Sequence, residues 1–177
     1  ASIGPASLCL HWGLIILFVS HLIGFIGGSY NFGSWIEFFK WVGLGGGIIF
    51  LYGASWAFLR RIFIPQVKAM STPDDYIMLL LLILIAALGI YQSAIEMVFG
   101  VSFLAGPWIA SIFKLQPDVS AISAAPLINK LHIIIAFLFF AYFPFTKLVH
   151  FASYPFGYIN RPYVSMRTKK DKEAEQV

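Results

Sequence analysis

The stretch LCLHWGLIILFVSHLIGFI, residues 8–26, is nearly continuous in apolar side chains yet carries two histidines, His11 and His21. Its length suits a helix that crosses the hydrocarbon core of a membrane. The other two histidines of the chain, His132 and His150, lie in a second apolar stretch near the C-terminus. An unsatisfied polar group in hydrocarbon costs several kcal/mol, so each ring needs a partner. The pattern predicts two membrane helices whose histidines meet in pairs.

Composition indicates the same class of protein. The chain has 177 residues, is 59% hydrophobic and only 11% charged, and has a mean hydropathy of +0.82. A soluble domain carries about 25% charged residues. The single cysteine, Cys9, excludes an internal disulfide, an iron–sulfur cluster held by this chain alone and a covalent CxxCH haem site. We expect lipid around the chain and no nucleic acid bound to it.

The predicted fold class is all-α, an integral membrane bundle of four transmembrane helices in a single domain, residues 1–177. The four spans are residues 8–26, 38–59, 76–98 and 131–151. Pro144 lies inside the fourth span and is expected to kink it. In the long connection from Phe99 to Lys130, the stretch GPWIASIF is too short to cross a membrane, so we expect a surface or re-entrant segment.

Basic residues predict the orientation of the bundle. Arg60, Arg61 and Lys68 lie between the second and third spans, and residues 161–177 form a basic tail. Because cytoplasmic loops are enriched in Lys and Arg, we expect this connection and both termini in the cytoplasm of a cell membrane. The tail is interpreted either as an anchor on anionic lipid or as a docking site for a cytoplasmic partner.

Opposite helix directions would bring the four histidines into two pairs. His11 and His21 are ten residues apart, or about 15 Å along a helix axis. The fourth span runs the other way, so His11 is matched with His150 near the cytoplasm and His21 with His132 near the outer face. The eighteen residues from His132 to His150 make five turns and put both on one face. This spacing favours two non-covalent haems, each held by two histidines; isolated hydrogen bonds or a proton relay are the alternatives.

Three stretches carry a family resemblance. LCLHWGLIILFVSHLIG (8–24), LRRIFIPQVKAMSTPDDYIMLLLLILIAALG (59–89) and LHIIIAFLFFAYFPFTKLVHFASYPFGYINRPYVSMR (131–167) resemble, in matching order, the cytochrome b (gamma) subunit of respiratory nitrate reductase. The likeness covers nearly the whole chain, and its histidine spacings, ten and eighteen, are specific. Members of that family usually have one further helix before these four.

The resemblance implies a dihaem b-type electron-transfer subunit that oxidises quinol near the outer face. His11 and His150 would hold the proximal haem, and His21 and His132 the distal haem. Electrons would leave for a cytoplasmic iron–sulfur subunit and a catalytic subunit, for which molybdenum is a candidate metal. Cytochrome b subunits of heterodisulfide-reductase-like and sulfite-reduction-associated complexes belong to the same family, so fold alone does not fix the acceptor.

The same resemblance directs attention to residues that follow His21. Family members use a lysine after the outer-side histidine to bind quinol, and a loose alignment puts Trp35 or Glu37 in its place, with Lys40 as the nearby substitute. The family's glycine before that histidine is Ser20 here. The candidate quinol-binding residues are therefore Ser20, Trp35, Glu37 and Lys40, and the alternative is that they are ordinary interface residues.

Haem propionates need cationic or hydrogen-bonding partners. The candidates by depth are Arg60, Arg61 and Lys147 for the proximal haem and Lys130 for the distal haem; each is equally suited to anchoring a helix at the membrane surface. Glu96, near the outer end of the third span, suits a proton-exit carboxylate or a solvated helix end.

Other classes of function remain open from the sequence. A haem-free membrane anchor for a peripheral enzyme would use the histidines only for hydrogen bonds. A small proton or metal transporter would use them as a relay or as ligands, although such proteins usually show broken helices or repeats. A quinone reductase would keep the haems and reverse the electron flow.

Overall fold

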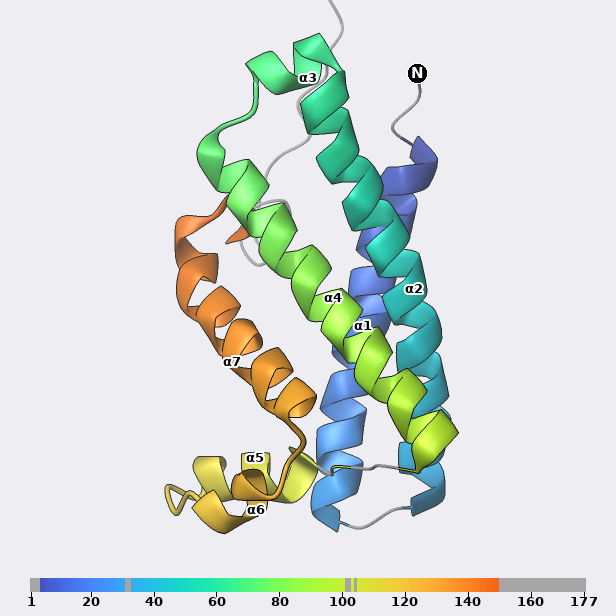
Figure 1. The fold of residues 1–177 in the computed structure, drawn as a ribbon, viewed down its shortest axis with the longest axis vertical. Coiled ribbons are helices and arrows are strands. Elements are labelled where there is room, and N and C mark those ends of the chain that lie inside the picture. The colour runs from blue at the N-terminus through green and yellow to red at the C-terminus, as the bar shows by residue number, and fades with distance from the viewer. Residues whose placement is uncertain (1–3, 31–32, 101–102, 104, 150–177) are drawn as a thin grey trace, which may run out of the picture. The chain divides into compact units, whose positions relative to one another are not determined.

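The computed structural model describes residues 4–30, 33–100, 103 and 105–149, and this part of the chain is helical with no strand. In chain order the elements are α1 (Gly4–Tyr30), α2 (Gly33–Phe63), α3 (Pro65–Ala69), α4 (Pro73–Phe99), α5 (Ala105–Phe113), α6 (Val119–Ser123), α7 (Leu127–Tyr142), η1 (Phe143–Phe145) and η2 (Lys147–Val149) (Figure 1). The first compact unit ends at Thr146, and η2 is the described part of the second unit.

Four helical segments are long and apolar enough to cross a membrane: α1, α2, α4 and α7 with η1. The predicted all-α fold with four spans is confirmed, and the protein is a multi-pass membrane protein. Three spans extend beyond their predicted bounds at both ends, since the polar residues that flank the apolar cores continue the same helices.

The fourth span differs from its prediction. The α-helix ends at Tyr142 and the chain continues as a short 3₁₀ turn, Phe143–Phe145, so Pro144 terminates the helix rather than kinking it. Proline has no N–H to donate to the carbonyl of Phe140, and its ring clashes with that carbonyl in a continuous α-helix. The prediction that His132 and His150 share one face requires an α-helix that continues to residue 150; the α-helix ends at Tyr142, and His150 lies outside the described residues.

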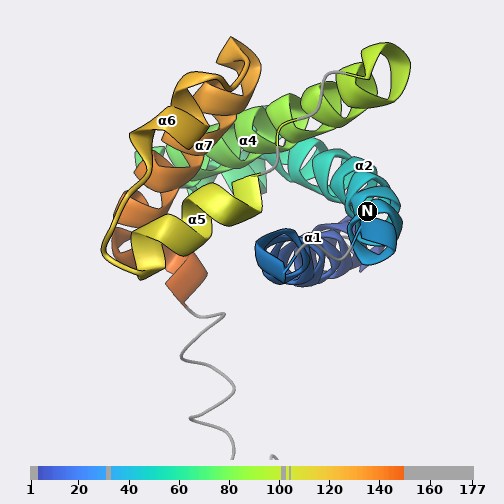
Figure 2. The ribbon, with the colours of Figure 1, turned by 90° about the horizontal axis from the view of Figure 1, so that it is seen from below.

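Successive long helices run in opposite directions and pack in chain order, α1 on α2, α2 on α4 and α4 on α7, while α5 packs on α1 (Figures 1 and 2). This alternation gives the first unit two ends. The α3 end contains the start of α1, the end of α2, α3 and the start of α4. The α5 end contains the end of α1, the start of α2, the end of α4, α5 and the start of α7.

Glycines allow α1 and α2 to approach closely. A Cβ added to Gly13 would lie 2.6 Å from the backbone of Phe50, and one added to Gly53 would lie 2.5 Å from the nitrogen of Leu10. Gly46 faces the Ile16 side chain in the same way. Small residues at such interfaces replace the hydrophobic driving force that lipid removes.

The α3 end is held by polar contacts between helices. The Tyr76 hydroxyl on α4 donates to the Arg61 carbonyl at 2.9 Å, and the Tyr142 hydroxyl donates to Asp74 Oδ1 at 3.0 Å. At the start of α4 the backbone N–H of Thr72 donates to Asp75 Oδ2 at 2.9 Å. The Thr72–Asp75 bond is part of a capping box at the start of α4, and the Tyr76 bond gives a partner to a carbonyl in the last turn of α2.

Candidate functional site

His21 on α1 and His132 on α7 lie close together although 111 positions separate them in the sequence. Their ring centroids are 6.4 Å apart and their planes are within 10° of parallel. Two imidazoles that bind one metal ion from opposite sides, each with a nitrogen about 2 Å from the metal, have centroids roughly 6 Å apart. The spacing and the near-parallel planes fit two ligands of one metal centre.

A backbone hydrogen bond orients each histidine of α1. His21 Nδ1 donates to the Leu17 carbonyl at 2.8 Å, and His11 Nδ1 donates to the Ser7 carbonyl at 2.7 Å. A carbonyl oxygen only accepts, so the proton of a neutral ring resides on Nδ1 and the lone pair on Nε2. Both rings are exposed. Metal-binding histidines are usually held in this way, with one nitrogen bonded to a backbone carbonyl and the other free for the metal.

Helix α4 positions the ring of His132. A Cβ added to Gly89 would lie 3.2 Å from His132 Cε1 and 3.6 Å from its Nδ1, so the ring rests where a larger residue would project. The Ile85 carbonyl one turn earlier is close to the ring, but the buried Nδ1 makes no hydrogen bond of standard length and angle to the described residues.

The surroundings of this pair are apolar. Phe25 makes an edge-on contact with the His21 ring at 5.9 Å between centroids, and Gly89 of α4 faces the His132 ring. Within residues 4–30, 33–100, 103 and 105–149, no three His, Cys, Asp or Glu side chains gather as a metal site. Two imidazoles in an apolar environment match the donor set of a bis-histidine haem.

The second predicted pair is described only in part, because His150 lies outside the described residues. His11 is close to a cavity of about 220 Å³ at the α3 end, through its hydrogen-bond partner Ser7. The cavity is lined by Ala6, Ser7, Trp56, Ala57, Arg60, Arg61 and Val67. The buried Nε atoms of both arginines make no hydrogen bond within the described part of the chain.

The two lysines predicted as propionate partners lie in different settings. Lys130, two residues before His132, donates from Nζ to the Ser123 carbonyl at 2.7 Å and so ties α7 to α6. Lys147 is exposed in η2, in the second unit. The structure thus shows a local bond for Lys130 and leaves its side chain at the depth of the His21–His132 pair.

The four candidate quinol residues do not form one cluster. Ser20 is buried, its Oγ has no hydrogen-bond partner among the described residues, and it faces Gly43 of α2. Trp35 is exposed and lines an apolar cavity of about 380 Å³ with Ile23, Ile26 and Gly27 of α1. By helical periodicity Ile23 and Ile26 lie on the face of α1 opposite to His21, so this cavity is separate from the histidine pair.

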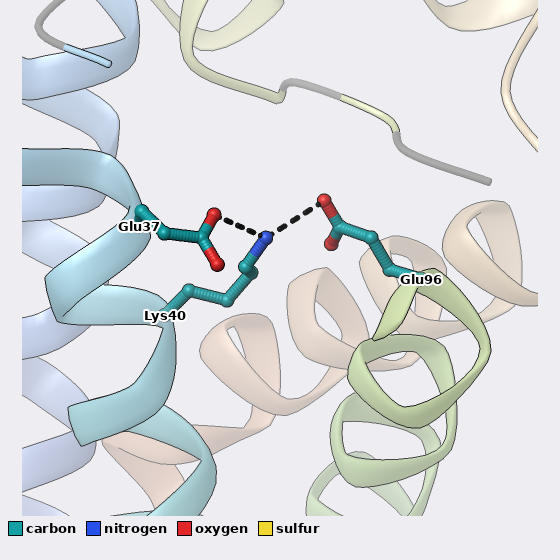
Figure 3. Close-up of polar contacts among 3 residues, drawn as sticks. All are labelled: Glu37, Lys40 and Glu96. Carbon is teal, nitrogen blue, oxygen red and sulfur yellow. Dashed lines mark hydrogen bonds and ion pairs between the residues drawn. The ribbon is translucent and has the colours of Figure 1, made fainter. Parts of the chain in front are cut away.

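Glu37 and Lys40 instead join a polar cluster with Glu96 at the α5 end (Figure 3). Lys40 Nζ lies 2.7 Å from Glu37 Oε2 on α2 and 3.2 Å from Glu96 Oε1 on α4. The sequence suggested separate roles for Lys40 and Glu96 but not this contact. The position of Gly89 beside His132 was also missed, although a glycine inside the most apolar helix is a signal of close packing.

Comparison with known proteins identifies the family. The model of the nitrate reductase gamma subunit family matches residues 2–169. The chain is 29% identical to the nitrate reductase gamma chain of Bacillus subtilis, over 94% of this chain and 79% of that protein. It is 28% identical to the respiratory nitrate reductase 1 gamma chain of Escherichia coli, over 93% and 77% of the two chains. The nitrate reductase-like protein NarX of Mycobacterium tuberculosis is 29% identical over 94% of this chain and 27% of its own length. The chain, a multi-pass membrane protein with paired histidines on α1 and α7, therefore belongs to the nitrate reductase gamma subunit family.

Proposed function

We propose that this chain is the quinol-oxidising, dihaem cytochrome b subunit of a nitrate reductase-type complex. In this proposal it takes electrons from quinol at the α5 end. It delivers them at the α3 end to an iron–sulfur subunit and a catalytic subunit on the cytoplasmic side. The observation that carries the proposal is the pair of parallel imidazoles, His21 and His132, 6.4 Å apart between antiparallel membrane helices. Membership of the gamma subunit family supports the same assignment.

The histidines would serve as axial ligands. His21 and His132 would hold the distal haem, and His11 with His150 the proximal haem. When bound, the haems supply one-electron redox chemistry that the side chains of this protein lack. The Leu17 and Ser7 carbonyls fix the ring orientations of His21 and His11 and leave Nε2 of each ring free for iron.

The cationic side chains would bind the propionates. Arg60 and Arg61 line the cavity beside Ser7, and their buried, unpaired N–H groups are suited to a carboxylate. Lys130 would have the same role at the other end, after exchanging its bond to the Ser123 carbonyl for a propionate oxygen. Lys147 remains a candidate for the proximal haem.

Of the four candidate residues, Ser20 and Lys40 are proposed to bind the ring of quinol. Ser20 precedes His21, and its buried hydroxyl has no partner in the described residues, so it is available to a hydroxyl of the ligand. Gly43 of α2 faces Ser20 of α1, and Lys40 lies three residues before Gly43. Lys40 and Gly43 therefore belong to one face of α2. Trp35 borders the separate apolar cavity, which suits the isoprenoid tail better than the ring.

A reduced-minus-oxidised spectrum with pyridine haemochrome quantitation tests the proposal directly. The unchanged protein is expected to contain two b haems per chain. His21→Ala and His132→Ala should each lose one haem and all quinol-dependent reduction, because the same iron loses one of its two axial ligands. His11→Ala is the matched control: it should lose the other haem and leave the first reducible by quinol.

Two results would contradict the assignment. Two haems in His21→Ala or His132→Ala would show that these rings are not ligands. Folded protein without haem would favour a membrane anchor, in which the histidines only form hydrogen bonds.

A further inference from the structure

The contact of Lys40 with two carboxylates has a property that a simple ion pair lacks. Glu37 and Glu96 share one ammonium group, and the three side chains have a net charge of −1 (Figure 3). If one carboxylate takes up a proton, the other still balances the charge of Lys40. The cluster can therefore take up a proton and become neutral, and when it releases the proton both carboxylates still contact the ammonium group, which limits the cost of the charge in a membrane helix.

The members of the cluster differ in exposure, and Glu37 is by far the most exposed. The side chain of Lys40 is 21% exposed and that of Glu96 is 27% exposed, whereas that of Glu37 is 59% exposed. Glu96 belongs to α4 inside the bundle, and Glu37 belongs to the first turns of α2. The three groups thus connect a sheltered carboxylate to one that is in contact with water at the α5 end.

The sheltered carboxylate is on the same side of α4 as the histidine pair. Gly89, which faces the His132 ring, and Glu96 are seven residues apart, close to two full turns. They share one face of α4 and are about 10 Å apart along its axis. Glu96 therefore lies between the level of His132 and the α5 end of the bundle.

We propose that Glu96, Lys40 and Glu37 form a proton-exit relay for quinol oxidation at the α5 end, an inference that rests on the function proposed above. Each quinol loses two electrons to ferric b haem and two protons to the relay, one after the other. An O–H bond of quinol breaks as one forms on Glu96. Lys40 then gives a proton to Glu37 and takes the replacement from Glu96, so it stays cationic, and Glu37 releases the proton to water.

A purely structural role for the cluster makes a different prediction. In that case the Lys40–Glu96 pair only fastens α2 to α4, and any pair of opposite charges at these positions would serve. The double variant K40E/E96K restores an ion pair between the helices but removes the proton-accepting carboxylate from α4. Because Lys40 is also a proposed quinol-binding residue, the two roles are separated by the rate at saturating quinol, where weaker binding no longer limits the rate.

The experiment compares variants of the full-length protein in its complex, in lipid vesicles with a short-chain quinol. Glu96→Gln is expected to slow quinol-dependent haem reduction at least 10-fold and to slow proton release outside the vesicle equally. Haem content and reduction by dithionite should be unchanged. K40E/E96K should recover the thermal stability that Glu96→Gln loses, but not the rate. Asp118→Asn is the control, because it removes one carboxylate at the same end while an asparagine can still cap α6.

Quinol-dependent rates within twofold of the unchanged protein in Glu96→Gln, or full recovery of the rate in K40E/E96K, would overturn the relay and leave the proposed function intact. Absence of haem or of quinol-dependent reduction in the unchanged protein would instead overturn the proposed function and the relay with it.

Discussion

At the scale of single residues, Gly89 determines how His132 is placed. The ring lies where a side chain at position 89 would project, 3.2 Å from an added Cβ to Cε1. We predict that Gly89→Ala displaces the ring by a few tenths of an ångström toward α1 and lowers the content of the proposed distal haem below one per chain. The other haem should be unaffected. Haem quantitation and the α-band of the reduced spectrum measure this.

Gly45→Ala provides the control for that variant. It makes the same change in a membrane helix, but its Cβ would meet no atom within 4 Å. Both alanines favour helix by up to about 1 kcal/mol over glycine, so a difference between the variants reports the contact with His132. Full haem content in Gly89→Ala would mean that the ring adjusts without loss, and that position 89 has no part in ligand placement.

At the scale of elements, the α1–α2 interface depends on backbone contact. A Cβ at position 53 would lie 2.5 Å from the Leu10 nitrogen and 2.8 Å from its Cα, and neither atom can move without moving α1. Overpacking of this kind typically costs about 1–3 kcal/mol. We predict that Gly53→Ala lowers the thermal unfolding temperature in detergent, whereas Gly45→Ala on the same helix leaves it unchanged or raises it. Equal unfolding temperatures would show that the helices separate at little cost.

The elements also show which features of the molecule a sequence can predict. The four spans were predictable because a membrane helix needs a long apolar run, and the pairing of His21 with His132 followed from antiparallel direction and depth. The Lys40–Glu96 contact could not be predicted from the sequence, because it depends on how α2 and α4 are rotated about their axes. Helices that are apolar on all sides carry no stripe that specifies rotation. The end of α7 before Pro144 was missed, because a proline inside a membrane helix is compatible with either a kink or a stop.

At the scale of the whole molecule, the chemistry of the two ends differs. At the α3 end Arg60, Arg61 and Lys68 outnumber Asp74 and Asp75, whereas at the α5 end acidic and basic residues are equal in number: Glu37, Glu96 and Asp118 against Lys40, Lys114 and Lys130. An excess of basic residues favours retention on the cytoplasmic side. The same asymmetry suits the proposed chemistry, because protons would be released at the α5 end through the Glu37–Lys40–Glu96 cluster and electrons delivered at the more basic α3 end.

Cysteine labelling tests this orientation. Cys9 is the only cysteine of the chain, so Cys9→Ala gives a background for S34C at the start of α2 and Q66C on α3, both at exposed positions. In intact spheroplasts a membrane-impermeant maleimide is expected to label S34C at once and Q66C only after permeabilisation. Both should react fully in detergent, which controls for access. The opposite pattern would put the histidine pair and the proton relay on the cytoplasmic side. Quinol oxidation there would release its protons into the cytoplasm, and electrons would cross toward the outer face, so the charge separation across the membrane would have the opposite sign.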